Sequence, residues 1–165
     1  MDVMDLRRGL LMEKAGVAYE ARNLSFDRTN YVDTGVKLFS QANINRDFEV
    51  ILSGIQGDYT NSATQTLVCA KHNGNGYGFL IRPSGSTEHK YNGTIFIQQN
   101  TKGTVIIKRV NGVLSCEGAV ITNQPVPFNN SVFDWPLVLG CAVDDDGSYY
   151  RYCAGSIDHV IVRWI

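Results

Sequence analysis

The chain has 165 residues, of which 44% are hydrophobic and 19% are charged, and its formal net charge is −1. This length and composition suit one folded domain with one core and exclude a disordered chain. Proteins that bind duplex nucleic acid usually carry an excess of basic residues, so nucleic acid is not expected as a partner. No apolar run approaches the roughly 20 residues that a membrane-spanning helix needs, so no membrane is expected either.

Residues 1–22 differ in pattern from the rest and are predicted to form a short helical arm. Asp5 is a suitable cap for a helix that begins at Leu6 and stops near Gly16. A helix this short is marginal alone, so it needs its own sheet or another subunit to pack on. The residues that we expect to anchor the chain in an assembly are Leu6, Arg7, Arg8, Leu10 and Leu11. The apolar stretch after Arg8 is too short for a signal peptide, which predicts synthesis in the cytoplasm.

From residue 23 onward the pattern is that of β-structure. Short apolar runs with alternating character are separated by turn residues at intervals of about ten residues, which favours a sandwich or jelly roll. Asn111-Gly112 lies between two such runs and is a strong hairpin signal, because both residues accept positive φ. We therefore predict an all-β fold, a two-sheet antiparallel jelly-roll sandwich over residues 23–165. The predicted strands lie at 24–26, 31–38, 48–52, 65–70, 77–82, 94–97, 104–110, 113–121, 137–143, 149–153 and 157–165.

The four cysteines are Cys69, Cys116, Cys141 and Cys153. None forms a Cys-x-x-Cys pair, and no Cys/His spacing suggests zinc. Each lies in an apolar run, which favours buried free thiols. Cys141 and Cys153 are nearly symmetric about Asp146-Gly147, so a disulfide across a hairpin remains an alternative in an oxidising compartment.

Three segments resemble the concanavalin A-like/laminin-G-like jelly-roll superfamily. They are Leu24–Val36, Val105–Leu114, and Leu137–Cys141 together with Arg151–Val160. The leader Leu6–Met12 also resembles those of minor structural proteins, such as decoration or tail proteins, of tailed bacteriophages. The first resemblance implies the jelly-roll fold, and the second implies a place in a virion.

Lectin branches of this superfamily imply a glycan site, which needs an exposed aromatic platform with polar partners. The candidates are Tyr59, Tyr77, Tyr91 and Trp135, with Asn75 as a polar partner. For Trp135 the alternative is a structural role, in which it plugs one end of the sandwich beside Phe128 and Phe133.

Calcium is the one alternative to a protein without cofactors. Asp144, Asp145 and Asp146 offer several hard oxygen ligands in one turn. Asp-Gly is also an ordinary choice for a hairpin turn, and the segment lacks the EF-hand spacing.

Catalysis is not expected. Glycoside hydrolysis requires two carboxylates, one on each side of the scissile bond. Glucanases of this fold carry these acids as Glu-x-Asp-x-x-Glu on one strand, and this sequence lacks that pattern.

The sequence leaves three functional hypotheses. The first is a non-enzymatic virion structural or decoration protein whose arm binds other virion proteins or copies of itself. The alternative is a carbohydrate-binding module that recognises cell-surface or mucin glycans. A glucanase-like glycoside hydrolase is the third.

Overall fold

The computed structural model describes residues 16–57, 65–70, 78–81, 87–91, 94–98, 104–116, 119–122, 132–144 and 146–165, with backbone alone for 78–81, 87–91, 94–98, 114, 116 and 119–122. All regular structure in these ranges is β, and every strand pair is antiparallel. Within them, no helix has the length and apolar character needed to cross a bilayer.

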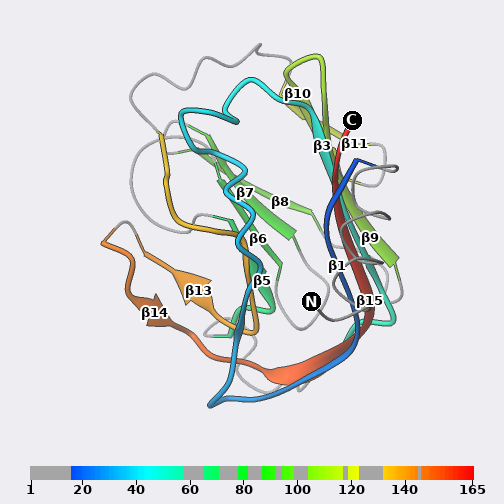
Figure 1. The fold of residues 1–165 in the computed structure, drawn as a ribbon, viewed down its shortest axis with the longest axis vertical. Coiled ribbons are helices and arrows are strands. Elements are labelled where there is room, and N and C mark those ends of the chain that lie inside the picture. The colour runs from blue at the N-terminus through cyan, green and yellow to red at the C-terminus, as the bar shows by residue number, and fades with distance from the viewer. Residues whose placement is uncertain are drawn as a thin grey trace, which may run out of the picture.

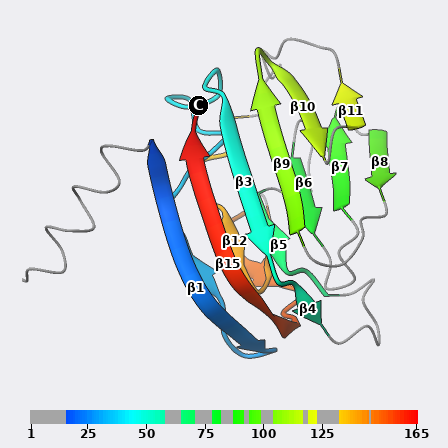
Figure 2. The same cartoon turned by 90° about the vertical axis from the view of Figure 1, so that its right-hand side faces the viewer.

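The larger sheet runs in the order β1-β15-β3-β9-β10-β11 (Figure 2). Its two longest strands, β1 (Val17–Asp27) and β15 (Ala154–Trp164), pair along their whole length. The other members are β3 (Phe48–Ser53), β9 (Thr104–Val110), β10 (Val113–Cys116) and β11 (Ala119–Thr122), and the short β4 (Gln56–Gly57) also pairs with β15. Strand β15 therefore lies inside the sheet although it follows every other strand in the chain.

The second sheet lies behind the first in Figure 2 and runs in the order β2-β12-β5-β6-β7-β8. Its members are β2 (Val32–Asp33), β12 (Val138–Leu139), β5 (Val68–Cys69), β6 (Gly78–Ile81), β7 (Thr87–Tyr91) and β8 (Thr94–Gln98). A separate hairpin of β13 (Ala142–Val143) and β14 (Tyr149–Tyr150) projects at one side of the molecule (Figure 1).

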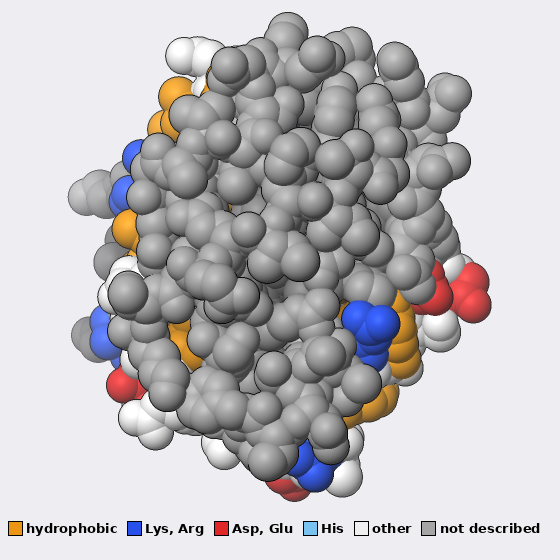
Figure 3. Space-filling model, turned by 180° about the vertical axis from the view of Figure 1, so that it is seen from behind, with side chains coloured by type: hydrophobic (Ala, Val, Ile, Leu, Met, Phe, Trp, Pro, Cys, Tyr) orange, Lys and Arg blue, Asp and Glu red, His pale blue; other side chains and the backbone are white. Residues whose placement is uncertain are grey.

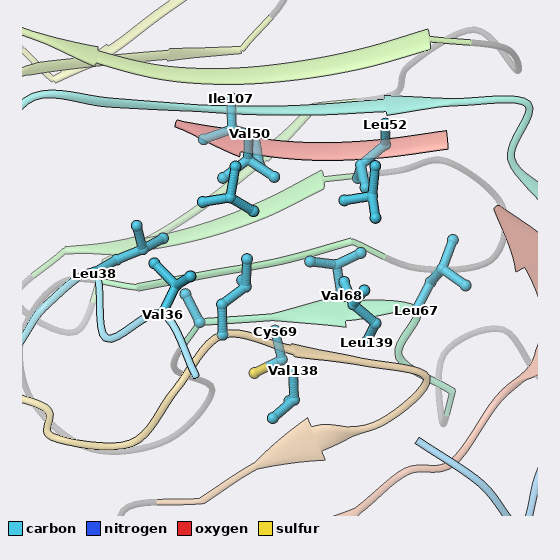
Figure 4. Packing of buried hydrophobic residues seen from close by; sticks show 14 of the residues in the cluster. Val36, Leu38, Val50, Leu52, Leu67, Val68, Cys69, Ile107, Val138 and Leu139 are labelled. Atoms are coloured by element: carbon cyan, nitrogen blue, oxygen red, sulfur yellow. The ribbon is translucent and has the colours of Figure 1, made fainter. Parts of the chain in front are cut away.

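The core lies between the two sheets. Phe48, Val50 and Leu52 alternate along β3 with no exposed surface, because every second side chain of a strand points to the same face. Opposite them, Val68 of β5 and Leu139 of β12 are equally buried, and Figure 4 shows Val50 and Leu52 on the side of β3 that faces Val68 and Leu139. This apolar burial is the main stabilising contribution to the fold.

The boundary predicted at residue 23 is wrong. Strand β1 begins at Val17, so residues 17–22 belong to the sheet and not to a helical arm. The reason is tertiary: this stretch alternates half-buried Tyr19 and Ala21 with exposed Glu20 and Arg22, and it pairs with β15. The predicted helix over Leu6–Met12 and the rest of residues 1–15 lie outside the described residues.

The hairpin at Asn111-Gly112 is confirmed. Both residues have positive φ, 51° and 76°, and Val110 pairs with Val113 across the turn. Strand β7 (Thr87–Tyr91) was not predicted, because its sequence is mostly polar and lacks apolar alternation.

The cysteine prediction is confirmed for three residues: Cys69, Cys141 and Cys153 are buried free thiols. Burial raises the pKa of Cys141 and of Cys153 to about 12, so both are protonated at neutral pH. Because both are free, Cys141 and Cys153 do not form the disulfide that the sequence left as an alternative.

Candidate functional site

Aromatic rings gather on the β13–β14 hairpin and the segment that precedes β2. The ring of Tyr31 stacks on that of Tyr149 at 4.4 Å between centroids and meets that of Tyr152 edge-on at 6.1 Å. Trp135 lies against the turn that leads into β14. Tyr31 and Trp135 are 40% and 41% exposed, so aromatic surface faces solvent here. We call these four residues, Tyr31, Trp135, Tyr149 and Tyr152, the aromatic corner.

The turn between β1 and β2 fixes Tyr31. The Asp27 carboxylate accepts hydrogen bonds from the Thr29 backbone N–H at 2.9 Å and from its hydroxyl at 2.6 Å. Asn30 closes the turn, because its side-chain oxygen accepts from the Asp27 backbone N–H and its amide donates to the Ser25 carbonyl. Such turns are local and need no core, which is why an exposed ring is held in one place.

Trp135 depends on a glycine. Gly147 has φ of 82°, and a Cβ built there would lie 2.6 Å from the indole ring, so only glycine lets the ring approach this turn. The turn itself is held by Asp146, whose carboxylate accepts from the Ser148 backbone N–H at 2.9 Å and hydroxyl at 2.6 Å. Bonds from Asp144 N–H to the Ser148 carbonyl and from Gly147 N–H to the Asp144 carbonyl complete it.

Two tyrosines of the corner, Tyr149 and Tyr152, stay neutral. Desolvation, reinforced by the charge of Asp33, raises the pKa of Tyr149 above its ordinary value, and desolvation also raises the pKa of Tyr152. Each phenol therefore keeps its O–H and offers one donor and one acceptor. Rings that combine an apolar face with a polar tip suit a ligand with both C–H faces and hydroxyl groups.

Two arginines with left-handed backbone flank the corner. Arg28 has φ of 75° and Arg151 has φ of 54°, a conformation that non-glycine residues rarely adopt. Arg28 donates its N–H to the Cys153 carbonyl, and the Arg151 guanidinium lies 5.5 Å from the Tyr150 ring centroid. Residues held in such backbone are concentrated at functional sites. Figure 3 shows hydrophobic side chains between basic and acidic ones at the lower right, the side where β13 and β14 lie.

Trp135 is the predicted glycan residue that the structure places at an exposed position, so it does not plug the sandwich, whereas Phe133 is buried. Tyr59, Tyr77 and Asn75 lie outside the described residues, and so does the side chain of Tyr91, whose backbone is in β7. Tyr31 was not predicted as a site residue because residues 31–38 were interpreted as an alternating strand. Its position directly after the turn-forming segment Asp27-Arg28-Thr29-Asn30 could have indicated an exposed ring.

The calcium alternative finds no support in the part of the chain that the structure describes. There, no group of three or more His, Cys, Asp or Glu side chains converges as a metal site would require. The Asp146 carboxylate accepts hydrogen bonds from Ser148, which lower the pKa of Asp146. This arrangement is the one expected of an ordinary hairpin turn. Asp145 lies outside the described residues.

Two glutamates with described side chains are paired with basic groups on the large sheet. Glu49 of β3 accepts from Arg163 Nε at 2.6 Å and lies 3.5 Å from Lys108 Nζ. Glu20 of β1 contacts His159 Nε2 at 2.7 Å and Arg22 at 3.5 Å. These partners suit a structural role in the sheet.

No protein-family model and no curated protein matches the chain. Solved structures with a similar fold do exist. The NanB sialidase of Streptococcus pneumoniae (K499G mutant) matches with TM-score 0.56 and 12% identity over 91% of this chain and 27% of its own. A leech intramolecular trans-sialidase matches with TM-score 0.53 and 15% identity, over 90% and 26%.

A third match is a separate domain. The Ruminococcus gnavus IT-sialidase CBM40, bound to α2,3-sialyllactose, matches with TM-score 0.51 and 18% identity over 90% of this chain and 92% of its own. The chain thus spans about a quarter of the named sialidases but nearly the whole of this domain. At these identities the likeness concerns the fold: this chain is a lectin-like β-sandwich.

Proposed function

We propose that this chain is a non-enzymatic carbohydrate-binding domain with a concanavalin A-like or laminin-G-like jelly-roll architecture, and that the aromatic corner binds the glycan. The observation that carries the proposal is the exposed ring of Tyr31, stacked on Tyr149 and held by a hydrogen-bonded turn. A preorganised ring loses little entropy when a ligand stacks on it.

The chemistry of the corner indicates the ligand class. Aromatic faces bind the C–H faces of pyranose rings, while the phenol groups and nearby amides bind hydroxyls. The backbones of Arg28 and Arg151 adjoin the corner, at Cys153 and next to Tyr152, and two cations on neighbouring segments favour a glycan that carries a carboxylate. Since one structural neighbour is bound to sialyllactose, sialylated glycans are the first ligands to test.

The test is a glycan array, with and without calcium, followed by titration of the best ligand. Tyr31→Ala is expected to weaken binding by about 2- to 13-fold, which corresponds to the roughly 0.5–1.5 kcal/mol of an aromatic pair. Tyr31→Phe keeps the ring and is expected to bind nearly as well as wild type, and Val110→Ala, an exposed apolar residue of β9, is the surface control. An array without any signal above background, or full binding by Tyr31→Ala, would overturn the proposal.

A virion role remains a prediction without support. The residues expected to anchor the chain, Leu6, Arg7, Arg8, Leu10 and Leu11, lie outside the described residues, and none of the structures named above is described as a phage protein.

A further inference from the structure

A pocket outside the aromatic corner is lined by residues of the large sheet and of the segment between β2 and β3. Its volume is about 320 Å³, within the range of small-molecule sites. It lies where β1 begins and β15 ends, at Ala18 and Trp164, whereas Tyr31 and Tyr152 adjoin the other ends of these strands. None of the four residues of the aromatic corner lines the pocket, although Asp134, the neighbour of Trp135, pairs with the lining residue Lys37.

One wall of the pocket comes from the segment between β2 and β3, which is held by its own backbone. Ser40 N–H donates to the Lys37 carbonyl, Asn43 N–H to the Ser40 carbonyl, and Arg46 N–H to the Asn43 carbonyl. The Asn43 side-chain amide donates to the Lys37 carbonyl at 3.0 Å, and the Arg46 carbonyl accepts from the buried Arg109 at 3.1 Å. This wall is therefore preformed.

The charge of the lining is entirely positive. Lys37 and Arg46 are both lining residues, and none of the lining residues is acidic. The Arg46 guanidinium lies 4.1 Å from the centroid of the Trp164 ring, which orients its plane. The Arg46 guanidinium also donates a long hydrogen bond, 3.4 Å, to the Asn43 side-chain oxygen. Within the described ranges no carboxylate pairs with Arg46. Lys37 pairs with Asp134 at 3.2 Å, but both groups are exposed, so this pair is weak.

We propose that this pocket binds a carboxylate-bearing ligand of monosaccharide size. The oriented guanidinium of Arg46 holds the carboxylate by two parallel hydrogen bonds, and the Lys37 ammonium adds a second cation. Ser40 and Asn43 meet the ligand's hydroxyl groups. The inference rests on this pocket alone and is independent of the glycan site at the aromatic corner.

The two tryptophans of the chain make a clean test, because one lies at each site. Protein labelled with 5-fluorotryptophan gives two ¹⁹F signals, which Trp135→Phe assigns. D-glucuronate is expected to shift the Trp164 signal saturably, with a Kd in the millimolar range. D-glucose is expected to leave it unchanged, and acetate to bind more weakly than glucuronate.

Arg46→Gln is expected to weaken glucuronate binding by about tenfold or more, since a charge-assisted hydrogen bond is lost. Arg46→Lys keeps the positive charge but not the planar guanidinium, so its affinity for glucuronate is expected to lie between those of wild type and Arg46→Gln. Arg22→Gln, an exposed arginine on β1, is the matched control and should bind as wild type. An unchanged Trp135 signal in each variant verifies that the fold is intact.

Three outcomes would overturn the proposal: a Trp164 signal that glucuronate does not move, an equal response by Arg46→Gln, or a response to glucose or acetate as strong as that to glucuronate. Loss of glycan binding at the aromatic corner would leave the Trp164 result unaffected, so the two proposals fail separately.

Discussion

Replacing Gly147 by alanine tests how the aromatic corner is built. The left-handed backbone at this position costs a residue with a Cβ roughly 1–2 kcal/mol, and the new methyl group would lie 2.6 Å from the Trp135 ring. Overpacking of this kind costs about 1–3 kcal/mol in a rigid site. Because the ring is exposed and its far edge is the part in contact, we expect it to swing away, at the lower end of that range.

Gly35 supplies the matched control. Its φ is 69°, close to that of Gly147, but a Cβ there would meet nothing within 4 Å. Gly35→Ala therefore measures the backbone strain alone. The difference in unfolding free energy between the two variants, about 1 kcal/mol, is the cost of displacing Trp135.

The assay is urea denaturation of both variants, with the ¹⁹F signal of Trp135 and the affinity for the array-selected glycan measured in parallel. Gly147→Ala is expected to unfold at a lower urea concentration than Gly35→Ala, to shift the Trp135 signal and to weaken glycan binding. Gly35→Ala is expected to change neither the Trp135 signal nor the affinity for the glycan. Equal midpoints together with an unmoved Trp135 signal would refute this account of the corner.

Three further predictions concern stability and titration. Phe48→Ala, which removes a fully buried ring that meets Phe39 edge-on at 5.9 Å, is expected to cost about 3–5 kcal/mol in urea denaturation; a loss below 1 kcal/mol would contradict the core described here. In a Cys116→Ser background the native protein is expected to resist a thiol-specific reagent at neutral pH, because Cys69, Cys141 and Cys153 are buried and burial raises the pKa of the last two to about 12; rapid labelling before unfolding would disprove this. The Asp27 and Asp146 carboxyls, whose pKa values are lowered by hydrogen bonds from Thr29 and Ser148, are expected to titrate by NMR below their ordinary range. Their stabilising contribution is present above the unfolded-state pKa and is lost as the pH falls through the folded one, so Asp27→Asn should flatten the acid limb of the stability profile; an unchanged profile would argue against these bonds.

Local signals predicted much of the fold. The Asn111-Gly112 turn and the apolar alternation of Phe48–Leu52 are encoded within a few residues, so they were readable without tertiary information. The start of β1 was not, because Val17–Arg22 becomes a strand only by pairing with β15, far along the chain. Strand β7 is likewise polar and depends on its neighbours.

The candidate site shows the same division. Trp135 was a candidate because a glycan site needs an exposed aromatic platform, and the structure places it at an exposed position, while its role in binding stays a prediction. The stacking of Tyr31 on Tyr149 joins residues more than a hundred positions apart, which no local pattern predicts. The pocket at Arg46 and Trp164 was missed for the same reason.

The place of β15 between β1 and β3 has a consequence for biosynthesis. While the ribosome is still translating residues 154–164, β1 and β3 each have an unpaired edge where β15 will lie. Such edges invite pairing with other nascent chains. The larger sheet therefore cannot be completed until this segment has left the exit tunnel, so the joining of β1 to β3 is a late step of folding.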